Sequence, residues 1–281
     1  MIGATRYISA AEIARQTRIS SDLAKLQQTV STGKRLTAAS DDPVAAARIA
    51  SIGTIQADHA VYAKNIGTGS AVASAADAKL ASVQTALTRA KELLLNGRTQ
   101  SASAIDRNAL ATEINSIGQD IAGYAAATDP QGRPLFPAAT PTSIPISDSL
   151  SIAATASQAS VFGGVVTAGG TKTIATILAS AATALQTGDT AGLSTSLDEL
   201  DAAMAHITTA QTDQGLRAGR FADMKTSLEN SDEDLSAERS GLEDTDLTYA
   251  LSEIQSKQLA LQAAQTVFAQ SHKSNLFSML G

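Results

Sequence analysis

The chain has 281 residues, a net charge of -6 and no cysteine or tryptophan, and alanine dominates its apolar residues. The missing cysteines exclude disulfides, thiol catalysis and cysteine-based metal sites, and the negative net charge argues against a nucleic-acid partner. No long unbroken apolar run occurs, so we expect no membrane insertion.

Residues 1–36 predict a helix that ends near Gly33, because its apolar residues recur every three or four positions. Arg6, Arg15 and Arg18 interrupt the apolar core that a cleavable signal peptide needs, so we expect no such peptide here. The apolar row of this helix predicts a contact surface: Ile8, Ile19, Leu23, Leu26 and Val30.

A second helix is predicted to begin at residue 43. Asp42 is a residue type that caps helix starts, and Pro43 suits the first helical position because its φ is fixed. Apolar periodicity then continues to Asn96 and Gly97, which predicts a rod of roughly 75 to 80 Å. A shorter antiparallel helix follows, and Ser103 and Asp106 have the spacing of a capping box at its start.

The residue composition changes after Asp129. Five of the six prolines lie within residues 130–145, and stretches of alternating polar and apolar residues follow at Ser147–Ala153 and Ser160–Thr167. Glycine pairs mark turns between them. These features predict a small β-rich insertion over residues 130–171.

Residues 172–186 predict a short helix, and a second long helix is expected to run to Leu242. Ser196 and Glu199 have capping-box spacing, although Asp189 offers an earlier start for the same helix. A last helix is predicted from Leu247 to Leu280. One side of this helix carries a mostly apolar row: Leu247, Leu251, Ile254, Gln258, Leu261, Gln265 and Phe268. Leu276 and Phe277 follow this row. Such a row needs a partner surface.

Gln258 and Gln265 admit two interpretations. They are either ordinary exposed residues or polar members of the row that fix the register between copies, as buried polar residues do in coiled coils.

This nearly symmetric order predicts a mainly α fold of long antiparallel rods with the terminal helices paired. We expect three domains: a terminal coiled-coil domain of 1–40 with 245–281, a rod domain of 41–129 with 172–244, and the outer insertion of 130–171. Charge favours the same pairing, because residues 1–50 hold seven basic and four acidic residues whereas 223–246 hold two basic and nine acidic ones. Opposite charges orient a contact more than they stabilise it.

Several segments resemble the bacterial flagellin superfamily, and within it the hook-filament junction proteins, also called third hook-associated proteins. The resemblance is carried by Gly33 in the segment STGKRL, by Asp41, Asp42 and Pro43 in SDDPVAAA, and by Gly132 and Phe136 in DPQGRPLF. The last residues, NLFSML, add to it. Pro43 favours the junction proteins, because filament flagellins usually differ there. Pro134 and Pro137 depart from the family's usual turn.

The resemblance implies a structural part of the extracellular flagellum. It implies export in an unfolded state by type III secretion, with a chaperone at the C-terminal helix. It also implies copies assembled in a ring through their terminal helices, between another hook-associated protein and flagellin. No enzymatic activity, cofactor or metal is expected, since no catalytic motif occurs.

Two alternatives stay open at this stage. The chain could be a short filament flagellin, which would polymerise by itself. From another class, it could be a soluble coiled-coil binding protein, which would have stably folded terminal helices as a monomer.

Overall fold

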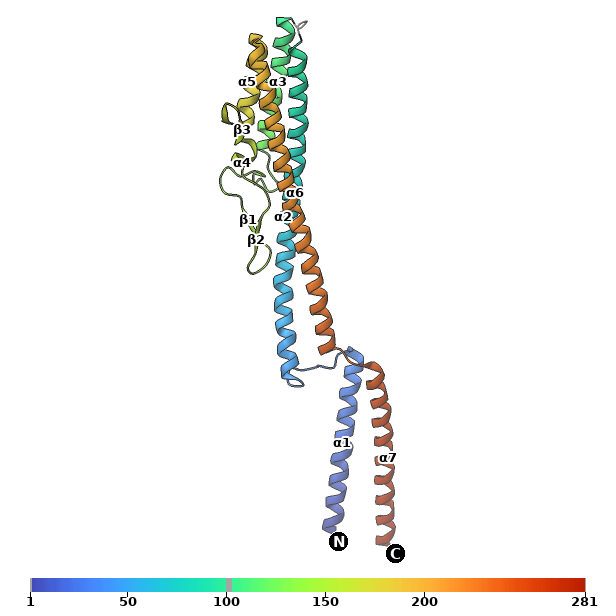
Figure 1. Ribbon diagram of the computed structural model, residues 1–281. Helices are drawn as coiled ribbons and strands as arrows, with labels where there is room; N and C mark the ends of the chain where they lie inside the picture. Colours follow the sequence, from blue (N-terminus) through green and yellow to red (C-terminus); the bar gives the residue numbers. More distant parts are fainter. Residues whose placement is uncertain (1, 100–102, 281) are drawn as a thin grey trace. The chain divides into compact units, whose positions relative to one another are not determined.

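The computed structural model describes the backbone of residues 2–99 and 103–280 and the side chains of 10–99 and 103–270. The fold is mainly helical, as predicted, with short strands in its central part (Figure 1). The helices are α1 (Ile2–Thr32), α2 (Pro43–Gly97), α3 (Ala104–Ala125), α4 (Gln158–Phe162), α5 (Ile174–Thr187), α6 (Thr190–Glu243) and α7 (Leu247–Leu280). The strands are β1 (Ser143–Pro145), β2 (Ser151–Ala153), β3 (Val165–Thr167) and β4 (Gly170–Lys172).

The chain divides into two compact units. Unit 1 comprises Met1–Gln56 and Asp232–Gly281, and unit 2 comprises Ala57–Ser231. Unit 1 therefore contains α1, α7 and one end of each long helix, whereas unit 2 contains the rest of α2 and α6 with everything between them. The predicted three-domain division stays a prediction.

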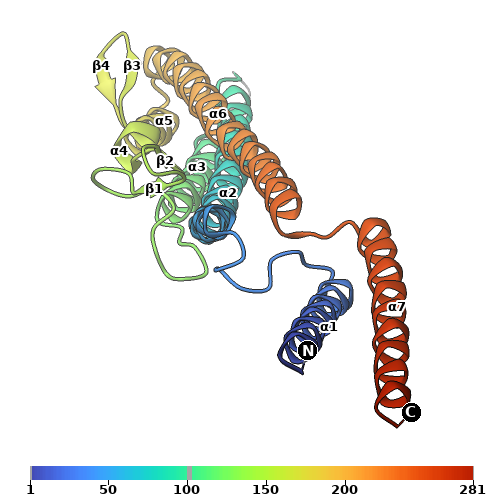
Figure 2. The ribbon, with the colours of Figure 1, turned by 90° about the horizontal axis from the view of Figure 1, so that it is seen from below.

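The core of unit 2 lies between α2, α3, α5 and α6. Its members recur at helical spacing and are fully buried, among them Leu80, Leu87, Ile114 and Leu200. Figure 2 shows α3 and α5 beside α2 and α6 in an end-on view. Small residues allow close approach here, since a Cβ added at Gly97 would lie 2.2 Å from the Leu185 side chain. Alanine and glycine thus bring these helices close together.

The insertion packs on the helices through the main core and through a second, smaller cluster. It consists of two antiparallel hairpins, β1 with β2 and β3 with β4, and the short helix α4. The buried amide of Gln214 in α6 joins three segments, because its Nε2 donates to the carbonyls of Ala73 (3.2 Å) and Ala154 (2.8 Å). Phe221 is fully buried in the same cluster. The insertion therefore depends on the rods for its core, as its small size requires.

Two local predictions were wrong. Residues 160–162, the start of the predicted alternating stretch Ser160–Thr167, belong to α4 rather than to extended chain, because the Ser157 hydroxyl caps the helix by accepting from the Ser160 N–H at 3.2 Å. Ser196 and Glu199 do not start α6, which begins at Thr190 and leaves both residues inside the helix. The earlier start after Asp189 is correct.

Candidate functional site: the terminal helix pair

The terminal helices α1 and α7 pack antiparallel within unit 1. Gln16 in α1 donates from Nε2 to the carbonyl of Ala264 at 3.3 Å. Nearer the other end of the pair, Lys257 Nζ lies 3.1 Å from Asp22 Oδ2. Rising residue numbers in α1 thus lie beside falling residue numbers in α7. The two terminal helices are therefore antiparallel neighbours, as predicted.

The predicted row of α1 lies on the face that packs against α7. Ile19, Leu23, Leu26 and Val30 are all half-buried, and Thr29 beside them is buried. The spacing of four and three residues keeps these side chains on one side of the helix. Ile8 lies outside the residues whose side chains are described. The partner of this row is thus the other terminal helix of the same chain.

The predicted row of α7 is divided between two environments. Ile254, Leu261 and Phe268 are half-buried and repeat every seven residues, so they share the face turned to α1. The other described members are exposed: Leu247 (49%), Leu251 (49%), Gln258 and Gln265. Leu276 and Phe277 lie outside the described side chains. Half of the row therefore stays uncovered in a single chain.

Further apolar side chains of the pair face solvent. Ile13 of α1 is 53% exposed, and Tyr249, Leu259 and Val267 of α7 are between 62% and 69% exposed. Within the described part of the two helices, no large apolar side chain is fully buried. Since two helices cover only one side of each other, the pair needs further helices around it to bury this surface.

Backbone hydrogen bonds join the segment that follows α1 to the segment that precedes α7. Gly33 has φ +71°, which ends α1 in the left-handed conformation that favours glycine. Its carbonyl accepts from the Thr245 N–H at 2.9 Å, and the Arg35 N–H donates to the Glu243 carbonyl at 2.7 Å. The Arg35 guanidinium also donates to the Leu242 carbonyl at 2.9 Å. The family-type segment around Gly33 therefore fixes where α1 ends and where α7 begins.

Ion pairs between the basic N-terminal and the acidic C-terminal segments surround these backbone hydrogen bonds. Lys34 pairs with the Glu243 carboxylate, and Arg48 makes a two-bond pair with Glu238 at 2.6 and 2.7 Å. Lys34, and after it Arg239, hold the pKa of Glu243 below its ordinary value. The predicted charge complementarity is thus confirmed in unit 1, although pairs this exposed contribute little stability.

Asp41 and Asp42 have separate structural tasks in the loop before α2. The Asp41 carboxylate accepts hydrogen bonds from Lys25 (2.8 Å), from the Thr37 hydroxyl (2.9 Å) and from the Ala38 N–H (3.0 Å). These bonds, led by that from Lys25, hold the pKa of Asp41 well below its usual range. Asp42 caps α2, because its Oδ1 accepts from the Ala45 N–H at 3.0 Å.

The third family-type segment forms a turn in unit 2. Asp129 accepts from the backbone N–H groups of Gln131 and Arg133, both at 2.9 Å, and pairs with the Arg133 guanidinium at 2.8 Å. Gly132 has φ +78°. Phe136 is buried and meets Phe162 edge to face, with ring centroids 5.2 Å apart. This segment anchors the start of the insertion.

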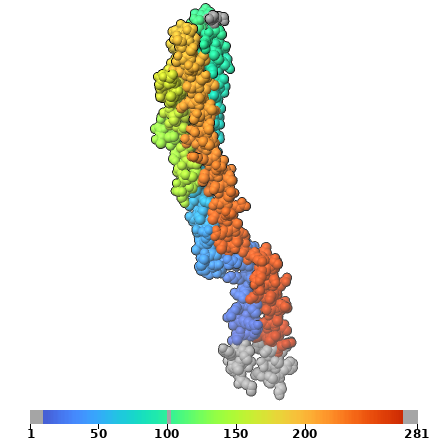
Figure 3. Space-filling model, viewed as in Figure 1, coloured from blue at the N-terminus to red at the C-terminus, as the bar shows by residue number. Residues whose placement is uncertain are grey.

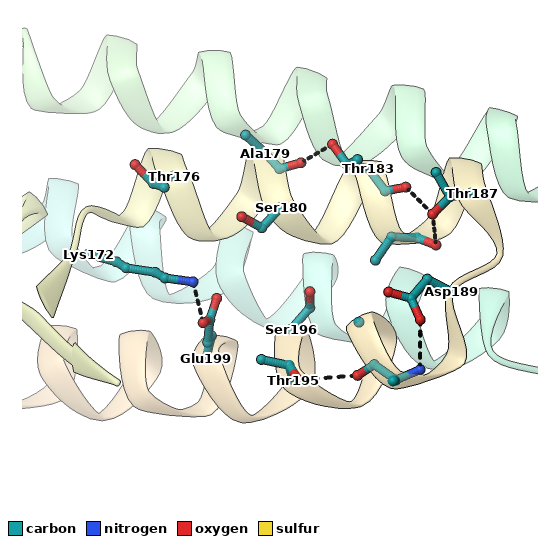
Figure 4. Close-up of a pocket in the computed structure, with 13 residues that line it drawn as sticks. Lys172, Thr176, Ala179, Ser180, Thr183, Thr187, Asp189, Thr195, Ser196 and Glu199 are labelled. Atoms are coloured by element: carbon teal, nitrogen blue, oxygen red, sulfur yellow. Dashed lines mark hydrogen bonds and ion pairs between the residues drawn. The ribbon is translucent and has the colours of Figure 1, made fainter. Parts of the chain in front are cut away.

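The described residues assemble no metal site. No group of three or more His, Asp or Glu side chains lies close enough to hold a metal ion in that part of the chain. An open groove of about 620 Å³ between α5 and α6 is lined by hydroxyls and by the pair of Lys172 with the buried Glu199 (Figure 4). Lys172 neutralises the Glu199 carboxylate in this groove.

The helical regions match known flagellar proteins. Residues 4–140 match the family model of the bacterial flagellin N-terminal helical region, and residues 197–280 match that of the C-terminal helical region. The chain belongs to the bacterial flagellin family. Members of this family are structural proteins, so this chain is a structural protein and not an enzyme.

Two curated relatives show how much of the sequence is shared. Flagellin of Salmonella muenchen is 35% identical over 86 residues, which are 30% of this chain and 17% of the relative. Flagellar hook-associated protein 3 of Salmonella typhimurium is 28% identical over 112 residues, 40% of this chain and 35% of the relative. The matched part is thus well under two thirds of either relative.

Solved structures share the fold over more of the chain. A flagellar hook-associated protein from Vibrio parahaemolyticus has a TM-score of 0.64 at 18% identity and covers 73% of this chain and 100% of its own. The flagellar junction protein FlgL from Legionella pneumophila has a TM-score of 0.57 at 13% identity, covering 70% and 100%. The predicted fold class is confirmed. None of the helices in the described residues has the length and apolar character needed to cross a membrane.

Proposed function

We propose that this chain is a structural subunit of the bacterial flagellum that joins the hook to the filament. The observation that carries the proposal is the uncovered apolar surface of α1 and α7, including Ile13, Leu251, Leu259 and Val267. Burial stabilises by about 25 cal/mol per Å² of apolar surface, so this surface favours association with further helices. Copies of the same chain supply such helices.

The exposed residues occupy more than one side of the helix pair. Leu251, Gln258 and Gln265 repeat every seven residues along one flank of α7, whereas Leu259 and Val267 lie elsewhere on its circumference. A single partner covers one flank only. Contacts on several sides suit a subunit enclosed by neighbours on both sides, as in a ring.

The partners follow from membership of the flagellin family. We expect copies of this chain in a ring, another hook-associated protein on one side and flagellin on the other. We also expect export in an unfolded state by type III secretion, a chaperone that binds the C-terminal helix before export, and a final place outside the cell in the flagellum.

The junction role is supported by the likeness to hook-associated and junction proteins along their whole length, and by Pro43 at the start of α2. Filament flagellin is a second candidate, because the Salmonella flagellins have the higher identity over the segment they share. A minor filament protein would use the same terminal helices.

Labelling intact flagella with an antibody against unit 2 tests the proposal. A band where the hook meets the filament is expected. A coat along the filament would contradict the junction role and favour the second candidate. Purified subunit should also fail to form long filaments by itself, whereas a filament flagellin polymerises.

A further inference from the structure

The groove between α5 and α6 carries polar groups on both of its walls. Its volume of about 620 Å³ lies within the range of roughly 300–1,000 Å³ that is typical of small-molecule sites. α5 and the start of α6, coloured gold in Figure 3, lie at the same end of unit 2. Residues with hydroxyl groups line both helices: Thr176, Ser180, Thr183 and Thr187 on α5, and Thr195 and Ser196 on α6. The terminal helix pair makes no use of this groove.

A charged side chain is buried in the wall that α6 contributes. Glu199 is 4% exposed, and Lys172 donates to its Oε1. Burial of a carboxylate is unfavourable unless the charge is paired, and Lys172 supplies that pairing. The other carboxylate oxygen, Oε2, accepts no hydrogen bond from a described residue, and Figure 4 shows it turned toward α5. The pair therefore presents an acceptor and the remaining N–H groups of Lys172 to the groove.

Three threonines of the groove have already used their hydroxyl hydrogens. Thr183 donates to the Ala179 carbonyl at 2.9 Å, Thr187 to the Thr183 carbonyl at 3.0 Å, and Thr195 to the Ala191 carbonyl at 3.2 Å. A bond to the carbonyl four positions earlier is usual for a hydroxyl residue within a helix. These threonines therefore offer no free donor to a ligand.

Ser180 and Ser196 behave differently. Ser196 is only 3% exposed, and its hydroxyl makes no hydrogen bond to any described residue. Ser180 is half-buried and also makes none. Figure 4 shows the two side chains on the sides of α5 and α6 that face each other across the groove. Because a buried hydroxyl without a partner is unfavourable, the structure points to a partner that enters from the groove.

The polar groups define the chemistry of that partner. Oε2 of Glu199 accepts, Lys172 donates, and each serine hydroxyl does either. An alcohol group matches all of them, since it donates and accepts at the same time. The ion pair has no net charge, so an anion would face the carboxylate and a cation would face the ammonium group. The groove therefore favours a neutral ligand with several hydroxyls.

The remaining lining supplies small apolar contacts. Ala179, Ala184 and Ala191 lie among the hydroxyl residues of the groove. Their methyl groups suit the C–H surface of a sugar ring, which carries its hydroxyls around its edge. Water is the competitor for the same polar groups, and a sugar displaces it by reproducing the hydrogen bonds that water makes.

We propose that the groove between α5 and α6 binds a neutral saccharide. Ser180 and Ser196 hold its hydroxyls from opposite walls, and Glu199 and Lys172 accept from and donate to another of its hydroxyls. All of these residues belong to unit 2, so the inference does not depend on the junction role. Failure of saccharide binding would leave the antibody band at the junction unaffected.

Titration of the isotopically labelled full-length subunit, followed by NMR, tests the proposal. Glucose, galactose, mannose and N-acetylglucosamine are added separately. At least one of them should shift the amide signals of α5 and of the first turns of α6 in a saturable manner. If none of the four sugars shifts these signals, the groove holds water alone and the proposal is overturned.

A serine variant tests the residues that carry the inference. Ser180→Ala with Ser196→Ala should weaken the binding of that sugar by about tenfold or more, as expected for two lost hydrogen bonds. Both helices should stay folded, because alanine favours a helix more than serine does. The matched control is Thr183→Val with Thr195→Val, which removes two hydroxyls that are bonded within their own helices. Equal weakening by the two variants, or none by the serine variant, would overturn the proposal.

Charged probes test the class of ligand. Inorganic phosphate and putrescine, added in the same titration, should leave the signals of α5 and α6 in place. Tighter binding of either ion than of every sugar would assign the groove to a charged ligand and overturn the saccharide. Ser180→Leu fills the groove and should abolish sugar binding while thermal unfolding stays close to that of the wild type. A folded Ser180→Leu variant with unchanged sugar affinity would also contradict the site.

Discussion

Units 1 and 2 are both helical but bury their apolar side chains to different degrees. In unit 2 the apolar rows of α2, α3, α5 and α6 pack against one another, and side chains such as Leu80, Leu87 and Phe221 are fully buried. In the terminal pair of unit 1 the large apolar residues of α1 and α7 whose side chains are described are half-buried or exposed. The difference indicates that unit 2 has its own core, and it supports our proposal that the terminal pair acquires one on assembly.

The largest expected effect comes from truncating a buried side chain in the core of unit 2. Phe221→Ala should lower the free energy of unfolding of the free subunit by about 3–5 kcal/mol, because it leaves a cavity beneath the insertion. Leu261→Ala in the terminal pair should change it far less while impairing incorporation into flagella. Denaturant unfolding measures the free energy of unfolding of each variant, and an incorporation assay measures how much of it enters flagella. Equal destabilisation by the two substitutions would remove the contrast between the units.

The exposed glutamines of α7 give the next test. Gln258→Leu with Gln265→Leu should leave the free subunit's stability nearly unchanged, since both side chains are exposed. If they fix the register between copies, the variant should assemble with altered order or length, as loss of a polar coiled-coil residue does. Electron microscopy of the assemblies provides the measurement. Unchanged assemblies would show that both residues are ordinary surface groups.

Removing the cap of α2 should have a moderate effect. Asp42→Ala deletes the acceptor for the Ala45 N–H and should cost about 1 kcal/mol of helix stability. The loss should appear as faster hydrogen exchange in the first turn of α2. Asp42→Ser, which retains a capping oxygen, should restore the protection, and a failure to do so would rule out capping as the cause.

The smallest effect is expected at Asp41. Its folded-state pKa is depressed, chiefly by Lys25, so its contribution is present above the unfolded pKa of about 3.9. That contribution is lost as the pH falls through the folded value. Asp41→Asn should therefore loosen residues 33–42 at neutral pH, and the difference from wild type should shrink in strong acid. Protection of the loop amides, relative to their intrinsic exchange rates, that does not change with pH in the wild type would contradict this.

Much of the fold was predictable because its signals are local. The Ser103 and Asp106 capping box forms with both of its hydrogen bonds, and Pro43 begins α2. These features depend on residues three or four positions apart. The sequence pattern alone was enough to place them.

The failures involve tertiary contacts. The spacing of Ser196 and Glu199 matches a capping box, but Glu199 is buried and pairs with Lys172 on a different element. Likewise, a row such as Leu251, Ile254 and Gln258 does not reveal which members face α1 and which face outward. Each of these features could be interpreted only once the position of a second helix or strand was known.

Hydrogen exchange of the α1 and α7 amides tests the central claim most directly. In dilute free subunit we expect these amides to exchange far faster than those of α2 in unit 2, and in assembled flagella we expect both sets to be protected. Terminal helices as well protected in the dilute monomer as the core of unit 2 would show that the pair is complete by itself, and would contradict the account.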